Sequence, residues 1–171
     1  MRVYLVGYMG SGKSTVGRRL AHLTGWLFID LDKYIEERNC RSVPQIFAIE
    51  GELAFREKEH KALEEVSEFD NVVVATGGGA PCFFDNMALM NRTGTTLFLD
   101  VEPQILAGRL AVSKTERPLI KGKTRQELID FIIENLSKRR PFYELSHHRI
   151  TGTEINVDEI LRIISESPGH F

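Results

Sequence analysis

The chain has 171 residues, 42% of them hydrophobic, and its 22 basic and 24 acidic residues leave a formal net charge of -2. This length suits one domain with a sizeable core that needs no disulfide or metal staples. The balanced charge excludes a global attraction to nucleic acid or to an anionic membrane. Cys40 and Cys82 lie far apart without metal-ligand spacing, so we expect free thiols in a reducing compartment. We recognise no signal region and no apolar run of membrane-spanning length, and we expect a cytoplasmic protein.

The first predicted elements are a strand and a helix joined by a glycine-rich loop. The apolar run 3–6 precedes Gly7–Thr15, which reads G-x-x-x-x-G-K-[ST], and apolar positions 16, 20 and 23 then share one helical face. Strand, loop and helix in this order are typical of a phosphate-binding loop. Glycines let backbone N–H groups turn inward around phosphates, and the helix N-terminus adds donors and partial positive charge.

This loop predicts a nucleotide site. The residues expected to bind the nucleotide here are Gly10, Ser11, Gly12, Lys13, Ser14 and Thr15. Lys13 is expected to reach the outer phosphates, and the Ser14 hydroxyl to hold Mg²⁺. An ordinary glycine-rich turn is the alternative. A Rossmann loop fits worse, because Thr15 stands where its third glycine should be.

The next strand is predicted as a buried one at 26–29, followed by Asp30-Leu31-Asp32 and a short helix at 34–38. We expect the two acids to alternate in an extended segment and to share one site. Asp30 would hold Mg²⁺ through water, and Asp32 would accept a hydrogen bond and then the proton from an acceptor hydroxyl. The alternative is that both acids only end the strand and cap the helix.

A longer helix is predicted from residue 43 to about residue 67. Ser42 and Gln45 form a capping box at its start, and Gly51 is expected to break or bend it. A third buried strand at 71–75 leads into the glycine triplet 77–79, which we expect to bring backbone amides against a small polar substrate or the γ-phosphate. A tight turn before Pro81 is the alternative.

A helix at 83–91, a strand at 95–100 and a helix from 103 to about 112 follow. Residues 113–123 are rich in cations and lack periodicity, so they are either a solvated basic loop or a lid over phosphates. Arg117 in this segment suits the transition-state charge on a transferred phosphoryl group.

The last predicted elements begin with a capping box at Thr124 and Glu127, which opens a helix through Leu136 to Glu144. Pro141 is expected to kink or end a segment of this helix. A strand at 148–151 and an amphipathic helix at 157–165 complete the chain. Alternating strands and helices, with strands apolar on both faces, predict an α/β fold around a parallel sheet. Ligands of such sheets sit at the carboxyl ends of the strands, where the loop, the two acids and the glycine triplet are expected to converge.

The combined pattern resembles the shikimate kinase family over almost the whole chain. The matching segments are Gly7–Thr15, Asp30-Leu31-Asp32, Ser42–Phe47 with Gly51-Glu52, Phe55-Arg56-x-x-Glu59, Gly77-Gly78-Gly79, Arg117-Pro118-Leu119 and Lys138-Arg139-x-Pro141-x-Tyr143. The resemblance implies a three-layer P-loop NTPase fold with a five-stranded parallel sheet of order 2-3-1-4-5 and flanking helices. Residues 1–171 would form a single P-loop kinase domain, with a substrate-binding subdomain at about 32–62 and a lid at about 112–124.

The resemblance also implies the activity: ATP- and Mg²⁺-dependent phosphorylation of the 3-hydroxyl of shikimate, a step toward aromatic amino acids. The implied catalytic residues are Lys13, Asp32 and Arg117, with Arg117 also at the nucleotide phosphates. The implied shikimate-binding residues are Asp32, Arg56, Gly77, Gly78, Gly79 and Arg139, the two arginines at the substrate carboxylate. We expect a monomer with ATP and shikimate as its partners.

Two departures leave the adenine contacts open, because Arg109-Leu110 and the loop 153–156 differ from the family pattern. Two other functions are alternatives. Another small P-loop kinase, for gluconate or a nucleoside monophosphate, would use similar arginines for a sugar acid. A non-catalytic nucleotide switch of the GTPase kind would need an Asn-Lys-x-Asp motif, and the sequence contains none.

Overall fold

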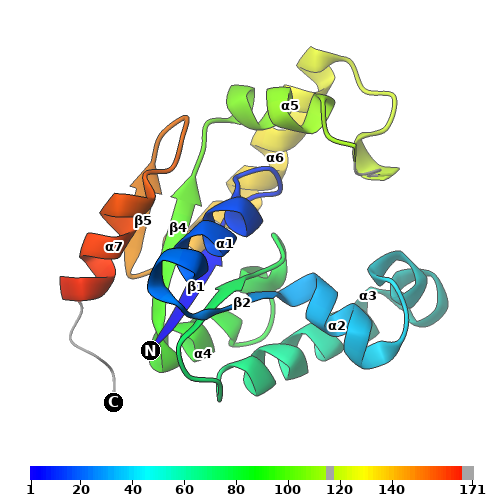
Figure 1. Cartoon of the computed structure of the whole chain (residues 1–171). Helices are drawn as coiled ribbons and strands as arrows, with labels where there is room; N and C mark the ends of the chain where they lie inside the picture. Colours follow the sequence, from blue (N-terminus) through cyan, green and yellow to red (C-terminus); the bar gives the residue numbers. More distant parts are fainter. Residues whose placement is uncertain (115–117, 167–171) are drawn as a thin grey trace.

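A five-stranded parallel sheet of order β2-β3-β1-β4-β5 lies at the centre of the molecule (Figure 1). The computed structural model describes residues 1–114 and 118–166. The strands are β1 (Arg2–Val6), β2 (Leu27–Asp30), β3 (Val72–Ala75), β4 (Thr95–Asp100) and β5 (His148–Thr151). The helices are α1 (Lys13–Thr24), α2 (Leu31–Asn39), α3 (Val43–Val66), α4 (Asn86–Thr93), α5 (Pro103–Ala111), α6 (Arg125–Tyr143) and α7 (Val157–Glu166), with short 3₁₀ turns η1 (Ala80–Cys82) and η2 (Pro118–Ile120).

The core lies on both faces of this sheet, as the predicted three-layer fold requires. Along β1, Val3 and Leu5 belong to the cluster that packs under α1 and α7. Tyr4 and Val6 alternate with them and belong to the opposite cluster, which includes residues of α3, α4 and α6. Because successive side chains of a strand point to opposite faces, one apolar run serves two cores. The predicted fold class and strand order are confirmed.

The outer strand β2 differs from the prediction of a buried strand. Only Ile29 of this strand is buried, and Leu27 is 54% exposed. The strand is at the edge of the sheet, with β3 as its partner. An apolar run does not distinguish an edge strand from a central one, so the sequence pattern predicted a buried strand where an edge strand is observed.

Most helix boundaries follow their local signals. Both capping boxes are present, at Ser42 with Gln45 and at Thr124 with Glu127. Gly51 interrupts α3 with φ 86° and ψ 174°, as predicted. The helix predicted from residue 83 begins instead at Asn86, because Phe84 has φ 48°, a value outside the right-handed α-helical region.

Pro141 does not end α6. The helix continues to Tyr143, whose side chain is fully buried against the core. A proline removes one N–H donor from the helix, and here the packing of the following residues outweighs that loss.

Both cysteines are free thiols, as expected. None of the helices in the described part of the chain is long and apolar enough to cross a bilayer.

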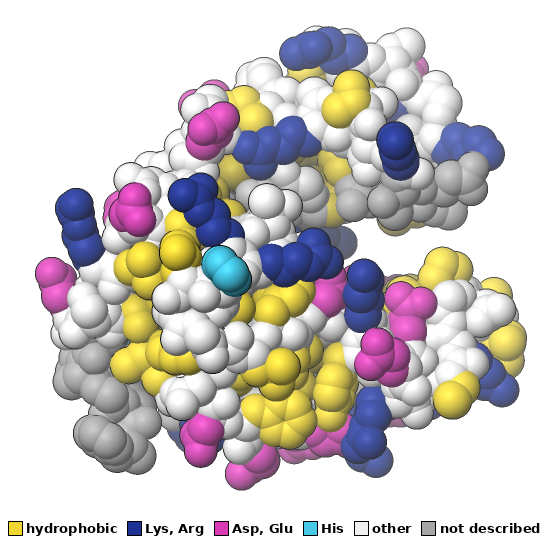
Figure 2. Space-filling model, viewed as in Figure 1, with side chains coloured by type: hydrophobic (Ala, Val, Ile, Leu, Met, Phe, Trp, Pro, Cys, Tyr) yellow, Lys and Arg dark blue, Asp and Glu magenta, His cyan; other side chains and the backbone are white. Residues whose placement is uncertain are grey.

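Two lobes project beyond the carboxyl ends of the strands. One is the α2–α3 pair, and the other is formed by α5, η2 and the start of α6 (Figure 1). Figure 2 shows the surface hollowed between these two lobes, with Lys and Arg side chains near the inner end of the hollow. The described residues of the expected substrate subdomain and of the expected lid belong to these lobes, and the roles of both segments stay predictions.

Candidate active site

The loop between β1 and α1 is shaped for an anion. Gly10 and Gly12 have φ 81° and φ 94°, a left-handed conformation that glycine adopts without strain. Gly12, at the N-cap of α1, provides no side-chain cap, and the first turn contains no acidic residue that would repel an anion. The Lys13 ammonium donates to the carbonyls of Gly7 (2.7 Å) and Tyr8 (3.0 Å) and so lies across the loop. Donors and positive charge therefore gather at one point.

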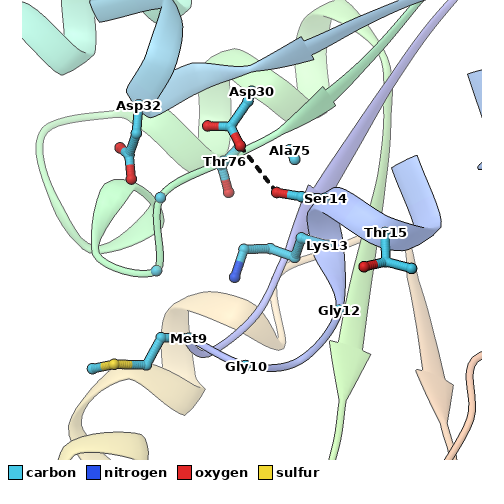
Figure 3. Close-up of a pocket in the computed structure, with 12 residues that line it drawn as sticks. Met9, Gly10, Gly12, Lys13, Ser14, Thr15, Asp30, Asp32, Ala75 and Thr76 are labelled. Atoms are coloured by element: carbon cyan, nitrogen blue, oxygen red, sulfur yellow. Dashed lines mark hydrogen bonds between the residues drawn. The ribbon is translucent and has the colours of Figure 1, made fainter. Parts of the chain in front are cut away.

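A pocket of about 360 Å³ opens beside this loop (Figure 3). Its wall combines the phosphate loop, Asp30 at the end of β2 with Asp32 just after it, and the turn after β3, so the three predicted strand ends do converge. Its lining residues are Met9, Gly10, Gly12, Lys13, Ser14, Thr15, Asp30, Asp32, Ala75, Thr76, Gly77 and Gly78. Met9 was not predicted, since an apolar residue inside the loop motif carries no signal of its own.

The two acids occupy different elements, which corrects the expectation of one extended segment. Asp30 ends β2 and caps α2, with Oδ1 accepting from the Lys33 N–H (3.4 Å) and Oδ2 from the Ser14 hydroxyl (3.0 Å). Asp32 is already in the first turn of α2. The cap lets the helix begin at Leu31, earlier than predicted. Both carboxylates still reach the pocket (Figure 3).

Asp32 has an environment that suits a proton acceptor. Burial raises its pKa above the usual range, the Asp30 charge adds to this effect, and the Lys13 charge opposes it. A carboxylate with a raised pKa holds a transferred proton better than an ordinary one. This is the property that the sequence-based hypothesis for Asp32 requires.

The turn at Gly77–Gly79 lies directly against four charged side chains. A Cβ on Gly77 would lie 3.1 Å from oxygens of both Asp32 and Glu59. The Cβ positions of Gly78 and Gly79 lie 3.2 Å and 2.6 Å from guanidinium nitrogens of Arg139 and Arg56, respectively. The segment is a tight turn, in which the Ala80 N–H donates to the Gly77 carbonyl (3.1 Å). Its backbone also lies close to the predicted site residues Asp32, Arg56 and Arg139.

Arg56 is held by α3 and is only 9% exposed. Its Nη1 donates to Glu59 Oε1 (2.8 Å), and the guanidinium lies 4.2 Å from the centroid of the Phe83 ring. Its buried Nε makes no hydrogen bond within the described residues, although Glu52 Oε1 lies 3.6 Å away. A buried guanidinium with spare donor capacity is suited to an anionic ligand.

Glu59 is a site residue that sequence reasoning did not assign. Its side chain is 1% exposed, and burial raises its pKa to about 7, against the opposing effect of Arg56. The available signal was its spacing of three residues from Arg56 on a helix, which places both side chains on one face.

Arg139 comes from α6 and lies 5.5 Å from the centroid of the Tyr8 ring, in the phosphate loop. Tyr143 of the same helix donates its hydroxyl to the Gly78 carbonyl. Arg56 and Arg139 thus flank the pocket at the glycine turn, outside its lining.

Arg117 lies outside the described residues, so its predicted role stays a prediction.

A second pocket, of about 450 Å³, lies on the other side of the phosphate loop and shares Gly10, Gly12 and Thr15 with the first. Ser11 lines it, together with Arg19, Arg109, Glu154, Ile155 and Val157. Arg109 donates to the carbonyl of Gly10 (3.0 Å) and to that of Thr153. Arg109-Leu110 and the loop 153–156 were the two departures noted in the sequence. They therefore meet beside the phosphate loop.

The oxygen atoms in the first pocket fit Mg²⁺. The Ser14 hydroxyl and the Asp30 carboxylate are adjacent, and hard oxygen ligands are those that Mg²⁺ prefers. The described residues contain no group of three or more His, Cys, Asp or Glu side chains spaced for a metal ion. A site completed by phosphates and water is consistent with that finding, because Mg²⁺ usually keeps several such ligands.

The phosphate loop follows the central strand of a parallel sheet, and a lysine, two acids and arginines lie at the same edge. These features together define a P-loop phosphotransferase for a small acceptor. A family model described as shikimate kinase matches residues 9–167. The shikimate kinase of Bacteroides fragilis is 54% identical over 86% of this chain and 83% of its own length. The chain belongs to the shikimate kinase family.

Solved structures agree with this assignment. The crystal structure of shikimate kinase from Bacteroides thetaiotaomicron matches with a TM-score of 0.92 at 46% identity, covering 96% of this chain and 98% of that one. Shikimate kinase from Acinetobacter baumannii in complex with shikimate matches with a TM-score of 0.83 at 34% identity, covering 96% and 92%. The comparisons do not favour a gluconate kinase, a nucleoside monophosphate kinase or a nucleotide switch.

Proposed function

We propose that this protein transfers the γ-phosphoryl group of ATP to the 3-hydroxyl of shikimate, which yields shikimate 3-phosphate for aromatic amino acid synthesis. The observation that carries the proposal is the convergence of Arg56 and Arg139 on the glycine turn beside Asp32. A pair of guanidinium groups next to a proton acceptor and a phosphate loop suits an acceptor that carries both a carboxylate and a hydroxyl. The family relationship supports the same acceptor.

The nucleotide would bind along the phosphate loop. Backbone N–H groups from Gly10 to Thr15 would hold its phosphates, and Lys13 would exchange its loop carbonyls for the outer phosphate oxygens. The base would lie in the second pocket, beside Arg109, which adjoins the phosphate loop. Ser14 would ligate Mg²⁺ directly and Asp30 through water, and the bound ion would supply charge neutralisation at the phosphates.

The acceptor would lie at the glycine turn. Arg56 and Arg139 would bind its carboxylate, while the backbone of Gly77–Gly79 would support its ring hydroxyls. Asp32 would orient the 3-hydroxyl and take its proton as the new oxygen–phosphorus bond forms and the bond to ADP breaks. The segment 32–62 would serve as the substrate subdomain, and the segment 112–124 as a lid that brings Arg117 to the phosphates. We propose a monomer.

A substrate panel tests this proposal. The purified protein is assayed with ATP and Mg²⁺ against shikimate, gluconate and nucleoside monophosphates, and the product is identified by mass and by phosphorus NMR. We expect turnover with shikimate alone, its loss on chelation of Mg²⁺, and its loss in Lys13→Ala. Comparable turnover with gluconate or a nucleoside monophosphate would overturn the assignment of the acceptor, and unchanged activity of Lys13→Ala would refute the role of that lysine.

A further inference from the structure

A charge cluster around one buried carboxylate includes Arg140, the residue next to Arg139, and the proposed mechanism does not use it. Asp100, at the carboxyl end of β4, is 8% exposed. Its two oxygens accept from the two terminal nitrogens of Arg140, at 2.9 Å and 3.0 Å. Arg149 of β5 adds a third hydrogen bond, from Nε to Oδ2 at 2.7 Å. A two-bond fork of this kind fixes direction as well as distance.

Arg139 and Arg140 are neighbours on α6, so their side chains leave the helix about 100° apart. One turn of the helix therefore presents Arg139 to the glycine turn and Arg140 to the end of β4. The rotation of this turn about the helix axis decides where Arg139 points. Whatever holds Arg140 in place also limits that rotation.

The same turn has a second anchor. Tyr143 donates to the Gly78 carbonyl and packs on Phe98, with ring centroids 5.2 Å apart. The Arg140 guanidinium lies 5.6 Å from the centroid of that same Phe98 ring. Pro141 lies between the two anchors and lacks an N–H donor, so this turn depends more on such contacts than an ordinary helical turn does.

The Asp100 carboxylate stays charged under working conditions. Burial alone would raise its pKa, but the hydrogen bonds and charges of Arg140 and Arg149 outweigh burial and hold the pKa below its usual range. Asp100 therefore keeps its charge, and with it the ability to accept both hydrogen bonds of the fork, in the pH range in which a kinase assay is run.

We propose that Asp100 and Arg140 are positioning residues: their fork sets the rotation of the last turn of α6 and thereby aims Arg139 at the acceptor carboxylate beside Gly78. This inference rests on the proposed function, in which Arg139 binds that carboxylate. In this proposal Asp100 and Arg140 act through Arg139 and would not touch the acceptor themselves.

The chain offers a matched control, because Arg149 binds the same carboxylate from β5, away from Arg139. Arg140→Lys and Arg149→Lys both keep the charge and lose guanidinium geometry. We expect Arg140→Lys to raise the KM and the Kd for shikimate roughly 10-fold, since small misplacements of a binding group are costly. The KM for ATP should stay unchanged, and Arg149→Lys should change neither constant. Equal effects of the two variants, or none, would overturn the inference.

Asp100→Asn and a double-variant cycle separate positioning from general stability. Asp100→Asn should raise the Kd for shikimate as Arg140→Lys does. In an Arg139→Lys background, Arg140→Lys should add less than about 2-fold, because the group that it aims is already impaired. Additive effects would mean that Arg140 acts independently of Arg139.

The readouts distinguish this inference from the proposed function. If the wild type bound shikimate without turnover, the proposed function would be refuted. The positioning inference could still be tested by comparing the Kd values of the variants for shikimate. Neither binding nor turnover would overturn both. Thermal unfolding midpoints identify a variant that merely loses stability, and a Kd that tracks those midpoints across all three single variants would count against positioning.

Discussion

The Arg56 guanidinium occupies the space that a side chain on Gly79 would need. A Cβ placed on Gly79 would lie 2.6 Å from Nη2 and 2.8 Å from Nη1 of Arg56. Gly79 has φ -89° and ψ -16°, which any residue adopts, so the constraint comes from the close approach and not from the backbone. This glycine is required by the position of an arginine that is 23 residues away in sequence.

Gly79→Ala is therefore expected to displace Arg56 while leaving the fold intact, because the atoms in the way are the far end of a flexible side chain. The KM for shikimate should rise roughly 10-fold or more, with the unfolding midpoint nearly unchanged. Gly108→Ala in α5 is the control, since its Cβ would meet nothing within 4 Å. Steady-state kinetics and thermal unfolding of both variants provide the measurement. A normal KM in Gly79→Ala would mean that Arg56 does not bind the acceptor.

Asp32→Asn should lower kcat by roughly 10²-fold or more, because the amide cannot take the proton of the acceptor hydroxyl. The pH profile supplies the control. Burial raises the pKa of Asp32, so the wild-type kcat should decline on the acid side above the usual carboxyl range, and this decline should vanish in the variant. A change confined to KM would show that Asp32 serves binding only.

Arg139→Lys keeps the positive charge and loses the fork that matches a carboxylate, so it should weaken shikimate binding and spare ATP. Lys138→Ala is a suitable control, because the Lys138 side chain is 70% exposed and, within the described residues, forms an ion pair only with Glu134. Calorimetric titration of each ligand measures the effect directly. Equal weakening of shikimate and ATP would contradict the assignment.

Glu59 should make stability depend on pH. Burial raises its pKa from 4.5 to about 7, so the folded state holds a proton that the unfolded chain releases. The stabilisation is complete below the unfolded value and is lost as the pH rises through the folded value. The free energy of unfolding of the wild type, relative to Glu59→Gln, should fall by roughly 1–3 kcal/mol over this window. Urea unfolding at several pH values measures the difference; a difference that does not vary with pH would contradict the raised pKa.

Much of the fold was predictable because its signals are local. The phosphate loop follows from the spacing of Gly7, Gly12 and Lys13 between a strand and a helix, and its backbone conformation agrees. The Ser42 capping box and the bend at Gly51 depend on a few neighbouring residues, and both are present. The convergence of three strand ends follows from the geometry of parallel sheets.

The errors arose where a helix cap or the packing of distant elements overrides the pattern that we followed. Asp32 was expected in an extended segment, but the cap provided by Asp30 starts α2 before it. Of the two effects expected of Pro141, a kink or an end, the end does not occur, because α6 reaches the buried Tyr143, one residue short of the predicted Glu144. The strand β2 was expected to be buried, and its place at the sheet edge leaves Leu27 exposed.

The amino-acid sequence by itself determined the phosphate loop, the order of the elements and the family, because these depend on spacing along the chain. Only the tertiary structure decided that Glu59 is buried against Arg56, that Arg109 joins Gly10 to Thr153, and that Asp100 holds Arg140. These contacts join side chains whose directions are set by the rotation and packing of whole helices. No short stretch of sequence contains that information, because it arises only when distant elements share one core.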